Sequence, residues 1–311
     1  MKILVFGAGA VGSLLGGLLA RMGHDVALLG RAPHVDAVEK NGLHISGLWG
    51  EYRIRTFDVY HAVSEIPPEK SAFDLILLTV KSFDTAAAAD LARPLVGEET
   101  TLLSFQNGLG NIEAIAARIP ADRFLVGRII TGVELEPGAV RVTVSADDLV
   151  IGSLPGPAPR RSAEEAARTF RLARIPARAV PNILAHVWLK AVYNCALNGL
   201  CSAREIPYGR ILETEEGRKT LEAVVRECYA VAAKQGVPLD PPAADGYYRL
   251  LVDKLIPATA AHYPSMLRDI QRGRRTEIDA LNGAVVRMGV ELGIPTPANR
   301  EIATLIRSRT I

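Results

Sequence analysis

A glycine-rich segment at the start of the chain constrains the fold more than any other feature. The segment reads Gly7-Ala8-Gly9-Ala10-Val11-Gly12, between an apolar run (2–6) and a stretch of helical character (11–22). Glycines at this spacing permit a tight turn, the approach of a pyrophosphate to the backbone, and close packing of helix on strand. A glycine-rich turn without a ligand is the alternative. The strand-loop-helix context favours a dinucleotide site.

The first part of the chain alternates short aliphatic runs with helical stretches, which predicts a parallel sheet covered on both faces. The expected strands are 2–6, 25–29, 73–79 and 101–104. The runs 124–130, 139–144 and 149–153 follow without a long helix, so we expect an antiparallel or mixed extension of the sheet. A helix over 162–172 and a last strand within 175–180 complete this part. The fold class is α/β, with a Rossmann-type doubly wound sheet.

Beyond Pro181 the pattern changes to helices, expected at about 182–203, 214–236, 242–261 and 275–292. We therefore predict a dinucleotide-binding Rossmann domain over 1–181 and an all-α substrate and catalytic domain over 182–311. Ligands commonly bind where two domains join.

Composition excludes several classes of function. The 311 residues carry a formal net charge of +2 and no long basic run, so we expect no nucleic-acid partner. Three cysteines without a C-x-x-C pair are typical of a reducing compartment. No stretch approaches the ~20 apolar residues of a membrane span, and the apolar amino-terminal run is too short for a signal peptide. We expect a cytoplasmic protein with no metal site, and a homodimer through the helical domain is one conceivable assembly.

Three polar residues, Lys190, Asn194 and Asn198, stand at every fourth position of a strongly apolar stretch. Four helical residues advance by about 400°, so these side chains form a slowly drifting stripe on one helix face. Buried polar groups are costly unless they find partners. The stripe therefore faces either water or a polar ligand, and the neighbouring domain junction and cofactor loop favour the ligand.

Polar residues also follow the predicted strands of the first domain. Arg31 comes after the second strand, where an acidic residue would select the ribose 2′-hydroxyl of NAD. A guanidinium suits a 2′-phosphate, so we expect Arg31 to bind NADPH/NADP+. The alternative is that Arg31 is an ordinary solvated arginine. Lys81 and Asn107 follow the third and fourth strands and should border cofactor or substrate. Asn107-Gly108 could alternatively be only a turn.

A polar cluster near the end of the chain contains Ser265, Asp269 and Glu277. Thr276 and Asp279 resemble a capping box at the start of the helix expected at 275–292. Capping residues and solvated charges are the alternative to a functional cluster. Sequence spacing alone does not bring Glu277 to Lys190.

Together these motifs resemble the ketopantoate reductase (2-dehydropantoate 2-reductase) family, nearly end to end. The resemblance rests on the glycine loop, Arg31, Val80-Lys81, Phe105-Gln106-Asn107-Gly108, Trp188 to Asn198, Pro264-Ser265-Met266 and Arg275 to Asp279. It implies reduction of 2-dehydropantoate to (R)-pantoate with NADPH, on the path to pantothenate and coenzyme A. It also implies a Rossmann domain, a helical domain and an active site between them.

The resemblance assigns roles to single residues. Lys190 matches the catalytic lysine and Glu277 the active-site acid. Asn194, Asn198 and Ser265 match substrate-binding residues, and Lys81 and Asn107 match first-domain residues that line the cofactor and substrate cleft. Members often read Asn-Pro-Leu-Thr where this chain has Asn198-Gly199-Leu200-Cys201. This departure leaves open which 2-oxo acid is the substrate.

The chemistry fits these residues without appeal to the family. Hydride delivery to a ketone leaves negative charge on oxygen, which a nearby ammonium stabilises and protonates. Lys190 is therefore the expected general acid. Two rivals stay open at this point. A β-hydroxyacid dehydrogenase also pairs Lys and Asn on a helix, and a nucleotide-sensing regulator would bind NADPH without turnover.

Overall fold

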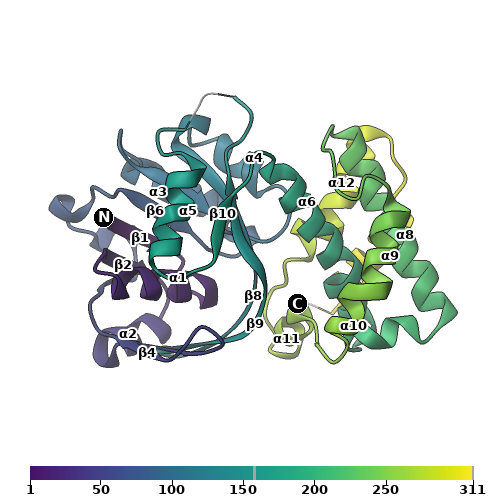
Figure 1. The fold of residues 1–311 in the computed structure, drawn as a ribbon, viewed down its shortest axis with the longest axis horizontal. Coiled ribbons are helices and arrows are strands. Elements are labelled where there is room, and N and C mark those ends of the chain that lie inside the picture. Colours follow the sequence, from purple (N-terminus) through teal and green to yellow (C-terminus); the bar gives the residue numbers. More distant parts are fainter. Residues whose placement is uncertain (157–158, 310–311) are drawn as a thin grey trace. The chain divides into compact units, whose positions relative to one another are not determined.

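The computed structural model describes residues 1–156 and 159–309, which form two compact units (Figure 1). The first unit comprises Met1–Gln106 and Asn111–Ile183. The second comprises the chain from Leu184 on together with Asn107–Gly110. This short segment lies between two parts of the first unit in the sequence, yet it belongs to the helical one.

The strands described in the first unit form one ten-stranded sheet in the order β4-β3-β9-β8-β7-β6-β1-β2-β5, with β10 beside β9. Their bounds are β1 Lys2–Phe6, β2 Asp25–Leu29, β3 Leu43–Gly47, β4 Tyr52–Ile54, β5 Asp58–Tyr60, β6 Leu75–Leu78, β7 Thr101–Ser104, β8 Phe124–Glu136, β9 Ala139–Gly152 and β10 Ala177–Ala179. The run from β8 through β7, β6, β1 and β2 to β5 is parallel throughout. This confirms the parallel α/β core.

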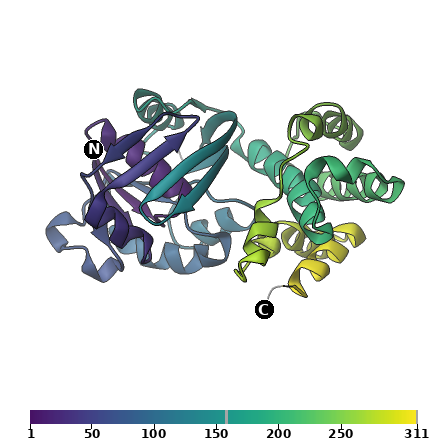
Figure 2. The same cartoon turned by 90° about the horizontal axis from the view of Figure 1, so that it is seen from below.

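Both faces of the sheet are covered, because every residue of β1 beyond Lys2 is buried. Ile3 and Val5 pack in the core with α1 and α5, while Leu4 and Phe6 point to the opposite face and are equally shielded. The helices of this unit are α1 Ala10–Arg21, α2 His34–Asn41, α3 Thr85–Ala92, α4 Asn111–Ala116 and α5 Ala163–Leu172. Figure 2 shows helices on both sides of the sheet.

The mixed extension of the sheet is also confirmed, but with longer strands than expected. β8 and β9 pair antiparallel, and the runs 139–144 and 149–153 belong to one continuous strand, β9. From the sequence, these two runs are expected to be separate. Instead, Asp147 forms an ion pair with the buried Arg128 of β8, at 2.5 Å, beside an irregularity in the strand register.

The second unit is helical, as expected. Its helices are α6 Ile183–Tyr193, α7 Leu200–Arg204, α8 Glu215–Lys234, α9 Ala244–Leu250, α10 Ile256–Ala258, α11 Ser265–Gln271, α12 Asn282–Leu292 and α13 Pro297–Arg307. π-Helical segments join α6 to α7 (Asn194–Gly199) and α9 to α10 (Leu251–Leu255). None of the helices within 1–156 and 159–309 is both long and apolar enough to cross a membrane.

Two expectations for this unit were wrong. No helix begins at 275: a 3-10 turn spans Ile278–Ala280, and α12 begins only at Asn282. Thr276 and Asp279 therefore form no capping box, because the Asp279 carboxylate accepts instead from the Arg307 guanidinium at 2.7 and 2.9 Å. Furthermore, α11 was not predicted as a separate helix.

Candidate active site

The glycine loop is a tight turn between β1 and α1. Gly7 has a φ of +106°, and its N–H and that of Ala8 both donate to the carbonyl of Leu29 at the end of β2. The hydroxyl of Thr79, just after β6, donates to the Gly7 carbonyl at 2.8 Å. The loop is thus held from the strands on both sides of β1.

The remaining two glycines of the loop have opposite surroundings. A Cβ on Gly12 would lie 2.4 Å from Thr79 Oγ1 and 2.5 Å from the Gly7 carbonyl oxygen. At Gly9, by contrast, the nearest atom to such a Cβ would be 3.9 Å away. Gly12 is therefore required by packing inside the protein. Gly9 leaves open space at the start of α1, which has no side-chain cap and no acidic residue in its first turn. Backbone N–H groups at an uncapped helix start can bind an anion, and the pyrophosphate site expected from the sequence stays a prediction.

The loops after β1, β2 and β6 lie at the same edge of the sheet, because these strands are parallel neighbours. The chain passes from β1 to β2 on one side and returns to β6 on the other. This reversal is the point at which open α/β sheets bind ligands. The glycine loop and Lys81 lie at this point, with Lys81 exposed just before a 3-10 turn.

Arg31 follows β2, and its guanidinium lies 2.9 Å from the Asp84 carboxylate. The preceding Gly30 packs against the glycine loop, since a Cβ there would lie 2.9 Å from the Cβ of Ala8. The Arg31 side chain is 86% exposed. An ion pair this exposed contributes little to stability, so a phosphate could replace the Asp84 carboxylate at small cost.

The loop after Arg31 is fixed by a buried histidine, His34, at the start of α2. Its Nε2 lies 2.9 Å from Ser13 Oγ of α1, and its Nδ1 lies 3.1 Å from the Gly138 amide nitrogen. Burial lowers the pKa of His34, so the ring is neutral at pH 7. Ser13 follows the glycine loop directly, so this contact ties α1 to the arginine-bearing loop.

Gln106 joins the loops after β6 and β7. From the sequence it was named only as part of Phe105-Gln106-Asn107-Gly108, without a role of its own. Its Nε2 donates to the Val80 carbonyl at 3.0 Å and to Thr85 Oγ1 at 2.6 Å. Its Oε1 accepts from the Ser104 hydroxyl at 3.1 Å. The side chain thereby fixes the backbone beside Lys81.

The next residues, Asn107–Gly110, belong to the helical unit. Gly108 has a φ of +88°, and a Cβ on it would lie 2.5 Å from the Ala280 carbonyl oxygen, so this position requires glycine. The N–H of Leu109 donates to the same carbonyl at 2.7 Å, and its side chain is buried in the helical core. Gly108 therefore lies in a bend of the chain that packs against Ala280. Asn107 thus belongs to the unit that contains Lys190 and Glu277.

The polar stripe of the sequence is divided by a change of helix type. Lys190 lies half-buried in α6, whereas Asn194 and Asn198 lie in the π-helical segment Asn194–Gly199. The wider π turn bonds residue i to i+5, so four residues no longer complete one turn. The helix expected at about 182–203 is confirmed, since helical residues run from Ile183 to Arg204. Its residues Asn194–Gly199 are π-helical rather than α-helical, so the drift of the stripe changes between Asn194 and Asn198.

Asn198 and Ser265 are brought together. Asn198 Nδ2 donates to Ser265 Oγ at 3.2 Å, and Asn198 Oδ1 accepts from the Met266 N–H at 3.1 Å. Asn198 is buried, while Ser265 is exposed at the start of α11. Asn198 thus orients Ser265 through these hydrogen bonds, in addition to any contact with a ligand.

The other candidates in this unit are Asn194 and Glu277. Asn194 is half-buried, and its side-chain amide makes no hydrogen bond within the part of the chain that the structure describes. Glu277 is buried beside the 3-10 turn at Ile278–Ala280, with 8% of its surface exposed. Its carbonyl accepts from the Ala280 N–H at 3.0 Å, which holds the turn.

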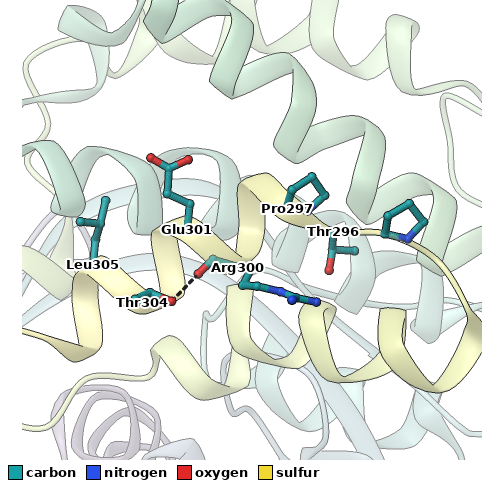
Figure 3. A pocket seen from close by; sticks show the side chains of 7 residues that line it. Thr296, Pro297, Arg300, Glu301, Thr304 and Leu305 are labelled. Atoms are coloured by element: carbon teal, nitrogen blue, oxygen red, sulfur yellow. Dashed lines mark hydrogen bonds between the residues drawn. The ribbon is translucent and has the colours of Figure 1, made fainter.

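A surface depression of about 540 Å³ lies elsewhere, along α13. Figure 3 shows its lining, including Thr304, whose hydroxyl donates to the Arg300 carbonyl at 2.9 Å. It is lined by none of the residues that the sequence singled out.

Comparison with known proteins identifies the whole chain. The family profile described as Ketopantoate reductase PanE/ApbA matches residues 3–156, and the corresponding carboxyl-terminal profile matches residues 182–310. The chain belongs to the ketopantoate reductase family.

Members of the ketopantoate reductase family match over nearly their full length. A 2-dehydropantoate 2-reductase of Aquifex aeolicus is 37% identical, covering 100% of this chain and 97% of that protein. One from Pyrococcus abyssi is 36% identical over 99% of this chain and 98% of that protein. The crystal structure of 2-dehydropantoate 2-reductase from Geobacter metallireducens has a TM-score of 0.89 at 33% identity, covering 100% of both chains.

A second solved structure shares the fold under another activity. It is the ternary structure of D-mandelate dehydrogenase with NADH and anilino(oxo)acetate. It has a TM-score of 0.87 at 29% identity and covers 99% of this chain and 98% of that one.

Proposed function

We propose that the chain catalyses the reduction of 2-dehydropantoate to (R)-pantoate with NADPH, and so serves pantothenate and coenzyme A synthesis. Membership of the ketopantoate reductase family across both units carries this proposal. The β-hydroxyacid dehydrogenase alternative is not favoured, since the similar curated proteins are 2-dehydropantoate 2-reductases. A cytoplasmic location and a homodimer stay predictions from the sequence.

The first unit supplies the cofactor site in this proposal. The residues Gly7, Ala8, Gly9, Ala10, Val11 and Gly12 would receive the pyrophosphate at the open start of α1. Arg31 would bind the 2′-phosphate, exchanging its contact with Asp84, and Lys81 would line the cofactor site. Asn107, which belongs to the second unit, would also contribute to cofactor binding. When bound, the reduced nicotinamide supplies the hydride.

The second unit supplies the groups that handle the substrate. As hydride reaches the ketone carbon, negative charge grows on the oxygen, and the Lys190 ammonium stabilises and protonates it. Glu277 would hold the lysine in its charged form, and solvent would return the proton to the lysine after turnover. Asn194, Asn198, Ser265 and Asn107 would hydrogen-bond the oxygens of the 2-oxo acid.

Oxidation of NADPH in the presence of 2-dehydropantoate tests the function. We expect turnover with 2-dehydropantoate to exceed that with aliphatic and aromatic 2-oxo acids by at least about tenfold in kcat/KM, since pocket contacts discriminate on this scale. The fold shared with D-mandelate dehydrogenase makes an aromatic 2-oxo acid the comparison to include. Higher kcat/KM with such a substrate, or no turnover of any 2-oxo acid, would contradict the proposal.

Replacement of Arg31 by alanine should abolish the preference for NADPH. The lost charge-assisted hydrogen bonds to the 2′-phosphate predict a fall of roughly 10- to 100-fold in kcat/KM for NADPH, with little change for NADH. Steady-state kinetics with both cofactors measure the ratio, and Arg55→Ala, at an exposed arginine of the same unit, is the matched control. If wild-type protein uses NADH as well as NADPH, the role given to Arg31 is wrong.

A further inference from the structure

The π-helical segment Asn194–Gly199 carries two of the proposed substrate-binding residues at a place where the helix deviates from regular α geometry. Such insertions are costly and occur frequently at functional sites. The segment contacts α8, α11 and α13. On the α11 side it is held by Asn198 itself, through Ser265 and Met266. The segment is also held by a set of polar side chains made of two buried asparagines and the half-buried Glu227.

Asn282, the first residue of α12, is the member of this set that touches the segment. Its Nδ2 donates to the Cys195 carbonyl at 3.3 Å and to Asn299 Oδ1 at 2.9 Å. A Cβ on Gly199 would lie 2.2 Å from Asn282 Oδ1, so only glycine allows this approach. Gly199, which stands where the resemblance implies proline, therefore leaves room for the Asn282 amide.

The orientation of the Asn282 amide is set from Glu227 on α8. The Glu227 carboxylate accepts from the Asn299 Nδ2 at 2.7 Å and from the backbone N–H groups of Ala298 and Asn299 at 2.8 and 2.9 Å. A carboxylate only accepts, so the Asn299 amide must turn its NH2 toward Glu227 and its oxygen toward Asn282. That oxygen in turn directs the Asn282 NH2 to itself and to Cys195.

Both asparagines are fully buried, with 0% of their surface exposed, so water cannot substitute for either partner. Each amide therefore has one preferred orientation, and the hydrogen bonds run in the order Glu227, Asn299, Asn282, Cys195 carbonyl. Asn282 Oδ1 is the atom that this order leaves without a hydrogen bond among the described residues, facing Gly199. An unsatisfied buried oxygen costs free energy of folding, and other interactions of the arrangement must offset that cost.

We propose that Glu227, Asn299 and Asn282 are positioning residues that fix the π-helical segment and thereby aim Asn194 and Asn198 at the substrate. The inference rests on the proposed function of those two asparagines. We call these three residues the relay. None of them needs to touch the substrate, because they act through the Cys195 carbonyl and the backbone at Gly199. A small displacement of positioning groups can change reaction rates by about 100-fold.

Asn282→Ala tests the relay directly. We expect KM for the 2-oxo acid to rise at least about tenfold, while KM for NADPH changes less than about threefold, because the cofactor loop lies in the other unit. The control is Val231→Ala, which truncates a fully buried side chain of α8 outside the relay. If both variants raise KM equally, or if folded Asn282→Ala keeps the wild-type KM, the relay has no positioning role.

Glu227 provides a second pair of variants in case Asn282→Ala does not fold. Glu227→Gln keeps the length and one acceptor oxygen for Asn299, whereas Glu227→Ala removes both. We expect Glu227→Ala to raise KM for the 2-oxo acid as Asn282→Ala does, and Glu227→Gln to restore it to within a few-fold of wild type. Equal KM values for the two would overturn the inference.

Hydrogen exchange separates failure of the relay from failure of the proposed function. Amides of residues 194–199 should exchange at least about tenfold faster in Asn282→Ala than in wild type, and those of β1 should be unchanged. This readout needs no turnover. If wild type reduces no 2-oxo acid, the proposed function fails while accelerated exchange still supports the relay, and unchanged exchange would refute it.

Discussion

Lys190→Ala should lower kcat for ketone reduction by about 10²- to 10⁴-fold, the contribution usual for a positioned general acid. Lys190 lies half-buried in α6, immediately before the π-helical segment that carries Asn194 and Asn198. Without its ammonium, the charge that develops on the substrate oxygen would lack both a stabilising cation and a proton donor. Stopped-flow oxidation of NADPH measures the chemical step, and NADPH binding should be unchanged.

Two further substitutions sharpen this expectation. Lys190→Arg keeps the positive charge but scarcely donates a proton at neutral pH, so its kcat should fall between those of alanine and wild type. Lys219→Ala removes an exposed lysine of α8 and should leave kcat unchanged. Reductase activity of Lys190→Ala within a few-fold of wild type would eliminate the general-acid role. A protein that binds NADPH with no turnover in any form would instead be a nucleotide-sensing regulator.

The second large effect is expected within the glycine loop, where one alanine substitution should weaken NADPH binding and another should lower the stability of the protein. Gly9→Ala adds a methyl group where the protein leaves open space, at a φ of −89° that alanine tolerates. The cofactor-free protein should keep its free energy of unfolding to within about 1 kcal/mol. The same methyl group would occupy the approach of the pyrophosphate, so the Kd for NADPH should rise by at least about tenfold.

Gly12→Ala should reverse this pattern. Its methyl group would collide with Thr79 Oγ1 and the Gly7 carbonyl, and overpacking of this kind costs about 1–3 kcal/mol. Urea unfolding of the cofactor-free proteins and NADPH titration together measure both effects. Loss of stability in Gly9→Ala with unchanged NADPH affinity would show that the loop is structural and not a pyrophosphate site.

Sequence reasoning succeeded where one local pattern determines the structure. β1, α1 and β2 follow from near-continuous apolar runs and from glycines with fixed roles, and both faces of β1 are indeed buried. The carboxyl ends of parallel strands must then meet at one edge, so Arg31 and Lys81 could be placed beside the glycine loop without coordinates.

It failed where a partner far along the chain decides the local conformation. Asp279 resembles part of a capping box with Thr276 in the sequence, but in the structure its carboxylate accepts hydrogen bonds from Arg307. The π-helical segment is equally invisible in the sequence, because its apolar pattern is that of an α-helix and the residue that packs against it, Asn282, lies far along the chain. Gln106 carried only a weak signal, an amide at a strand end.

The assignment of Asn107–Gly110 to the helical unit has a consequence for protein engineering. Leu109 fills part of the helical core, and its N–H closes a hydrogen bond to Ala280. A fragment that starts at Leu184 would therefore lack a piece of its own interior and expose the apolar surface beneath it. Chimeras that exchange substrate preference between relatives should transfer these four residues together with the carboxyl-terminal half. A single crossover point would pair Leu109 of one protein with the helical core of another.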